Sequence, residues 1–101
     1  VLGMANFRDF KKAIKDVLLE HRLYCSLAAG LKEGGEYEKA YELASQTYRA
    51  TITEVEALLV NIKTNSKEVK NKRVHFRGLY EQVLKICREN EAKLAEQLGI
   101  K

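Results

Sequence analysis

The 101-residue sequence contains no proline and no tryptophan, and it has only six glycines and two cysteines. Few turn-forming residues argue against a protein built from many short strands. No run approaches the ~18 consecutive apolar residues of a membrane helix, and the first residues lack the pattern of a signal peptide. We therefore expect no membrane span and a cytoplasmic location, with the nucleus as the alternative. We also expect Met4, the only methionine, to be the native start and residues 1–3 to be an addition.

The two cysteines, Cys25 and Cys87, are too few and too far apart for a metal-ligand pattern or a disulfide framework. Both fall on or beside apolar stripes, as buried reduced thiols do; a disulfide between the first and third helices is the alternative. Motifs for metal binding, nucleophilic catalysis and phosphate-binding loops are absent. We predict no enzyme activity, no catalytic residue, no metal, no cofactor and no small-molecule substrate.

The sequence does contain a spacing of three and four between apolar residues, repeated along three stretches. This period is typical of amphipathic helices that bury one stripe. We predict helices over residues 6–31, 36–63 and 67–98, and their short connections require antiparallel neighbours. The fold class is therefore all-α: one domain over 1–101, an elongated up-down-up three-helix bundle that self-association could complete. A helical hairpin with a protruding third helix is the alternative.

Residues with known capping preferences mark the ends of these helices. Asn6 is a suitable N-cap with Asp9 three residues later, and Ser66 is the expected N-cap of the third helix. Gly34 and Gly35 fit the first loop, and Gly99 ends the third helix. The predicted stripe of the second helix consists of Tyr37, Tyr41, Ala44, Tyr48, Thr51, Val55, Leu58 and Ile62.

Two polar residues, His21 and Asn90, interrupt the apolar stripes. For His21 we predict a buried neutral ring hydrogen-bonded to Thr47 or Tyr48, because buried polar groups are normally paired. Asn90 has two interpretations of equal weight. It is either a residue of the seam that fixes register or oligomeric state, or an exposed residue near a helix end.

Several leucines fall outside the predicted stripes. Leu19, Leu23 and Leu27 lie on the outer side of the first helix, and Leu43 is predicted to point outward from the second at similar height. Together they predict an exposed apolar patch, which typically binds a helical partner or a second copy. The first hypothesis is therefore a non-enzymatic interaction module, such as an adaptor, a chaperone-like protein or an assembly subunit. Bundle tilt that buries part of the patch is the alternative.

Cations gather at one end of the predicted bundle, where the first helix starts, the second ends and the third starts. The second hypothesis is that this end binds nucleic acid or another anionic surface, such as phospholipid headgroups. A merely solvated basic surface is the alternative. Gly78 lies on the outer side of the third helix, where packing does not require a glycine; it marks either a bend of the helix or a place that a partner approaches closely. The predicted anion-binding residues are Lys11, Lys12, Lys15, Lys63, Lys67, Lys70, Lys72, Arg73 and Arg77, with Arg8 nearby.

Overall fold

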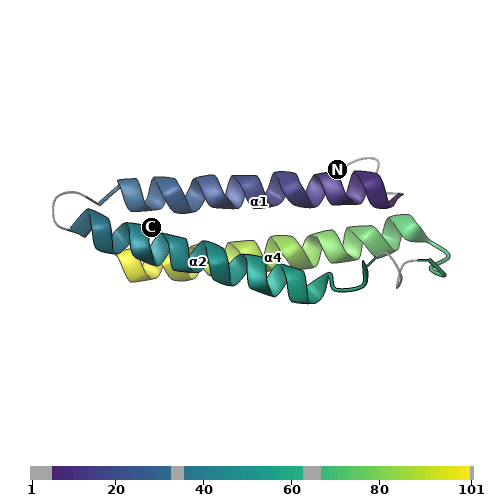
Figure 1. Cartoon of the computed structure of the whole chain (residues 1–101). Coiled ribbons are helices and arrows are strands. Elements are labelled where there is room, and N and C mark those ends of the chain that lie inside the picture. The colour runs from purple at the N-terminus through teal and green to yellow at the C-terminus, as the bar shows by residue number, and fades with distance from the viewer. Residues whose placement is uncertain (1–5, 33–35, 63–66, 101) are drawn as a thin grey trace.

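The computed structural model describes residues 6–32, 36–62 and 67–100. Within these ranges the chain forms three helices and no strand: α1 (Phe7–Gly30), α2 (Tyr37–Leu58) and α4 (Lys72–Leu98). The helices run in alternating directions and each packs on both others, so the start of α1 and the end of α4 lie at opposite ends of the bundle (Figure 1). The bundle measures 53 × 23 × 18 Å. The predicted elongated up-down-up three-helix bundle is confirmed.

The start of α1 is fixed by the predicted N-cap. The Oδ1 atom of Asn6 accepts a hydrogen bond from the backbone N–H of Asp9 at 2.8 Å, and its Nδ2 donates to the Asp9 carboxylate at 3.1 Å. These bonds satisfy one of the N–H groups that a helix start leaves free. α1 ends at Gly30, ahead of the predicted loop. Gly34, Gly35 and the proposed start at Met4 lie outside the described residues.

The second helix is shorter than predicted, because α2 ends at Leu58 instead of residue 63. The backbone N–H of Leu59 closes the last turn on the Val55 carbonyl at 3.0 Å. Beyond it, Asn61 takes a φ of +59°, in the left-handed region that asparagine tolerates better than most residues. A residue in that conformation cannot continue an α-helix.

The third helix also begins later than predicted, at Lys72 instead of residue 67. Asn71 provides the N-cap, since its Oδ1 accepts the backbone N–H of Val74 at 3.2 Å. Ser66, the expected N-cap, lies outside the described residues. The other end of α4 agrees with the sequence, because Gly99 follows it with a φ of +69°.

The core divides into two halves along the bundle. We call the part at the start of α1 the phenylalanine half, because the rings of Phe10 and Phe76 stack there with centroids 4.8 Å apart. The part at the end of α1 is the alanine half, where small side chains dominate the buried set. The buried members of the phenylalanine half are Phe10, Ile14, Val17, Val55, Phe76, Val83 and Cys87, and those of the alanine half are Cys25, Ala28, Ala29, Ala40, Ala44, Leu94 and Leu98.

The alanine half corrects the predicted stripe of the second helix. Tyr37 and Tyr41 were expected in the core, yet they are 46% and 55% exposed and their rings stack on each other at the surface, with centroids 6.3 Å apart. Ala44 is buried as predicted, and Ala40 is buried where the tyrosines were expected. Alanines leave little room between the helices, and a close-packed interior of this width has no space for a tyrosine ring.

Candidate functional site

A layer of buried polar side chains separates the two halves of the core. It contains His21 of α1, Thr51 of α2 and Asn90 of α4. The Nδ2 of Asn90 donates to Thr51 Oγ1 at 2.8 Å and to the Glu54 carboxylate at 3.1 Å, while Thr51 Oγ1 donates to the Thr47 carbonyl at 2.9 Å. Of the two interpretations of Asn90, the structure supports the seam residue.

His21 is buried as predicted, but its predicted partner is wrong. Its Nδ1 lies 2.8 Å from the Glu91 carboxylate of α4. A carboxylate accepts hydrogen bonds, so Nδ1 carries the proton. The Tyr48 ring only stacks on the imidazole, with centroids 6.1 Å apart, and the Thr47 hydroxyl donates to the Leu43 carbonyl of its own helix.

Cys25 completes a thiol, imidazole and carboxylate chain, with its Sγ 3.7 Å from His21 Nε2. Cysteine nucleophiles use the same connectivity. Here, however, burial and then the Glu91 charge raise the pKa of Cys25 from 9.0 to about 11. Burial followed by Glu91 and Glu54 does the same for Cys87. Both thiols are free and buried, so the expected reduced state is found. Cys25 stays protonated near neutral pH and donates within the core, unlike an activated nucleophile.

Three of the predicted interface leucines are strongly exposed: Leu19 is 56% exposed, Leu23 54% and Leu27 72%. Leu31, which the spacing of three and four predicts on the buried stripe of the first helix, is instead 67% exposed and extends the four-residue spacing of these leucines. We call these four residues the leucine face. Leu43 does not belong to it.

Leu43 is partly buried and packs on the core of the alanine half. It also lines a groove with Asn90 and Lys93, so it faces α4 and not the outer side of α1. The predicted patch of four leucines is therefore wrong at this residue. The spacing of Leu31, four residues after Leu27, was the signal that could have identified the fourth member.

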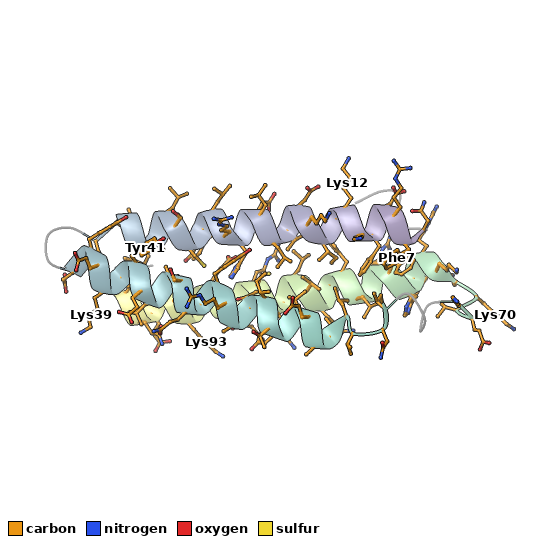
Figure 2. The ribbon with its side chains drawn as sticks, in the orientation of Figure 1. Phe7, Lys12, Lys39, Tyr41, Lys70 and Lys93 are labelled. Atoms are coloured by element: carbon orange, nitrogen blue, oxygen red, sulfur yellow. The ribbon has the colours of Figure 1, made fainter. Side chains whose placement is uncertain are left out.

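The predicted cations lie at one end of the bundle, and those within the described residues are all exposed (Figure 1). Lys63 lies outside them. No member of the set forms an ion pair within 4.0 Å of a described carboxylate. In Figure 2, Lys12 points away from α2 and α4 while Lys70 projects from the tip of the bundle, so these two cations lie on different sides of this end. We call this set the basic end.

Gly78 lies in open space on α4. A Cβ added there would meet no atom within 4 Å, so packing among the described residues does not require glycine. A partner's close approach at Gly78 stays a prediction.

Other kinds of site find no support in the described ranges. There, no three His, Cys, Asp or Glu side chains gather into a group that could hold a metal ion. Every helix of these ranges is too polar or too short to cross a membrane. Comparison of the chain with family models, curated proteins and solved structures finds no match.

Proposed function

We propose that the protein is a non-enzymatic docking module that binds an amphipathic helix of a partner protein through the leucine face. The observation that carries the proposal is the exposure of four leucines, each more than half accessible, three of them along α1 and the fourth at its C-cap. Contiguous apolar surface of this kind typically marks an interaction site. Covering each of these side chains contributes roughly 1 kcal/mol.

The spacing of the leucine face indicates how a partner helix would lie. Residues four apart form a ridge inclined to the helix axis, and packing such ridges into each other favours a crossing angle of about −50°. Lys15 and Lys12, both members of the basic end, precede Leu19 by four and seven residues, so they continue the same side of α1. The partner suited to this surface is a helix whose apolar stripe is followed by acidic residues.

The proposal includes no catalytic residue and no cofactor. Two free thiols in the core suit a reducing compartment. This supports a location in the cytoplasm, with the nucleus as the alternative.

The test compares the wild type with Leu19→Glu/Leu23→Glu. We expect the wild type to bind an apolar dye and a model helix of leucine, alanine and glutamate, and the double variant to lose both. The control is Val74→Glu, which places the same charge on an apolar residue of α4 that is 64% exposed. Equal loss in the control, or a wild type that binds neither probe, would contradict the proposal. The molar mass of the wild type from light scattering shows whether a second copy of the chain covers the leucine face instead of a partner helix.

A second candidate function is binding of a nucleic-acid backbone by the basic end. It is favoured by the exposed cations that have no ion-pair partner among the described carboxylates. We expect affinity for duplex and single-stranded nucleic acid to fall steeply with salt. The variant Lys70→Glu/Lys72→Glu/Arg77→Glu should abolish it, whereas Lys39→Glu/Lys93→Glu, at the other end (Figure 2), should not. Absence of binding by the wild type at low salt would end this hypothesis.

A further inference from the structure

A groove of about 280 Å³ opens between α1 and α2 in the alanine half. Its floor contains Cys25 and Ala44, both buried, and the groove exists because these side chains are small. Arg22 of α1 and Arg49 of α2 line it from opposite sides. No residue of the leucine face takes part. The remaining lining residues are Ser26, Tyr41, Ser45 and Tyr48.

The charge of this groove is positive and uncompensated. No carboxylate lines it, and neither arginine forms an ion pair with a described residue. The guanidinium carbon of Arg22 lies 5.9 Å from the centre of the Tyr48 ring. This cation–π contact helps to hold the guanidinium group beside the groove. The Cys25 thiol at the floor carries no charge near physiological pH, because burial and then the Glu91 carboxylate raise its pKa to about 11.

Two other grooves formed by described residues lack this combination. The groove between α2 and α4 that contains Leu43 also contains the Glu54 carboxylate. The depression along the start of α1 is lined by cations of a single helix together with Asp9. In the groove between α1 and α2, by contrast, cations from two helices meet hydroxyl groups without an acid.

We propose that the groove between α1 and α2 binds a small phosphate monoester. A phosphate monoester carries a charge of about −1.5 to −2 near neutral pH, which balances the charge of two guanidinium groups. A ligand with a single carboxylate would balance only one of them. Arginine forks bind phosphate oxygens in pairs, and Ser26, Ser45 and Tyr41 supply hydroxyl donors. The Tyr41 ring and the apolar floor suit the organic part of the ester. The groove volume lies near the lower limit of ligand pockets, so the ester is compact.

The test is a nuclear magnetic resonance titration of the whole chain with phenyl phosphate. We expect saturable shifts at the side-chain N–H groups of Arg22 and Arg49, and at Ser26 and Ser45. Arg22→Gln and Arg49→Gln should each weaken binding about tenfold, since a charged hydrogen bond contributes ~1.5 kcal/mol or more. Arg49→Lys, which keeps the charge but loses the planar fork, should weaken it less.

Controls separate local contact from overall charge. Arg88→Gln removes the same charge from an exposed residue of α4 that does not line the groove, and it should leave the affinity unchanged. Inorganic phosphate should bind more weakly than phenyl phosphate, and phenol should not bind. Shifts confined to the basic end, equal weakening by Arg88→Gln, or no saturation of the wild type would each overturn the proposal. None of these outcomes depends on whether the leucine face binds a helix.

Discussion

The two halves of the bundle distribute their large apolar side chains in opposite ways. In the phenylalanine half, two stacked phenylalanines and several branched residues fill the space between the helices. In the alanine half the interior holds four alanines beside Cys25, Leu94 and Leu98, while five further large apolar residues are exposed. The exposed apolar side chains of the alanine half therefore do not contribute to the packing of its own core. The exposed residues of this half are Leu23, Leu27, Leu31, Tyr37 and Tyr41.

The largest expected effect comes from emptying the phenylalanine half. Phe76→Ala removes one ring of the stack with Phe10 and leaves a cavity, so we expect the free energy of unfolding to fall by about 3–5 kcal/mol. Urea denaturation measures the change. Val74→Ala, on an exposed residue two positions earlier, serves as the control and should change stability little. Equal losses in the two variants would mean that the ring stack is not the core of this half.

Overfilling the alanine half should have a smaller effect. Ala29 is fully buried, and Ala29→Leu forces three methylene-sized groups into a tight interior, at a cost of about 1–3 kcal/mol. The same change at Ala57, an exposed residue of α2, should be nearly neutral. If Ala29→Leu instead stabilises the protein in urea denaturation, the alanine half is less closely packed than described.

The polar layer between the halves provides the third comparison. Asn90→Ala removes the hydrogen bonds to Thr51 and Glu54, and we expect a loss of about 1–2 kcal/mol. Gln97→Ala, on an exposed residue of the same helix, is the matched control. If the Asn90→Ala variant is as stable as the wild type, the polar layer affects the arrangement of the helices and not the free energy of unfolding.

The fourth comparison concerns the two thiols, one in each half, and its effect appears only at high pH. Their pKa values in the folded protein, about 11, lie above the ordinary value of 9.0. Between these values the unfolded thiols lose their protons while the folded ones keep them, so stability falls as the pH rises through this window. Below about 9 the contribution is fully present.

Cys25→Ala/Cys87→Ala is the comparison for the pH effect. The free energy of unfolding of the double variant should decline less between about pH 9 and 11 than that of the wild type. An identical decline would assign the pH dependence to lysines and tyrosines. In addition, an aromatic disulfide reagent should react slowly with both thiols in the folded wild type, because both are buried.

The helices were predictable from sequence because a period of three and four residues depends only on which side of each helix is buried. The ends of the helices were less predictable, because Asn71 and Ser66 are both good N-caps and the sequence alone does not rank them. Tyr37 and Tyr41 fit the helical period, but the core has no space for their rings, because its width there depends on buried alanines of both α1 and α2.

The candidate sites were predictable where one helix carries them. Leu19, Leu23 and Leu27 share a helix, so their outward position followed from spacing. The partner of His21 did not follow, because Glu91 reaches it from another helix. The groove that holds Arg22 and Arg49 was missed for the same reason, since it forms only where α1 and α2 meet.

The polar layer has one more consequence, for the handedness of the bundle. Asn90 and Glu91 are adjacent on α4, yet Asn90 binds α2 through Thr51 and Glu91 binds α1 through His21. In the mirror arrangement, with α1 and α2 exchanged around α4, the carboxylate would face Thr51 and the amide would face the imidazole. Apolar stripes pack almost equally well in either hand. Two neighbouring residues of one helix thus distinguish left from right for the whole fold.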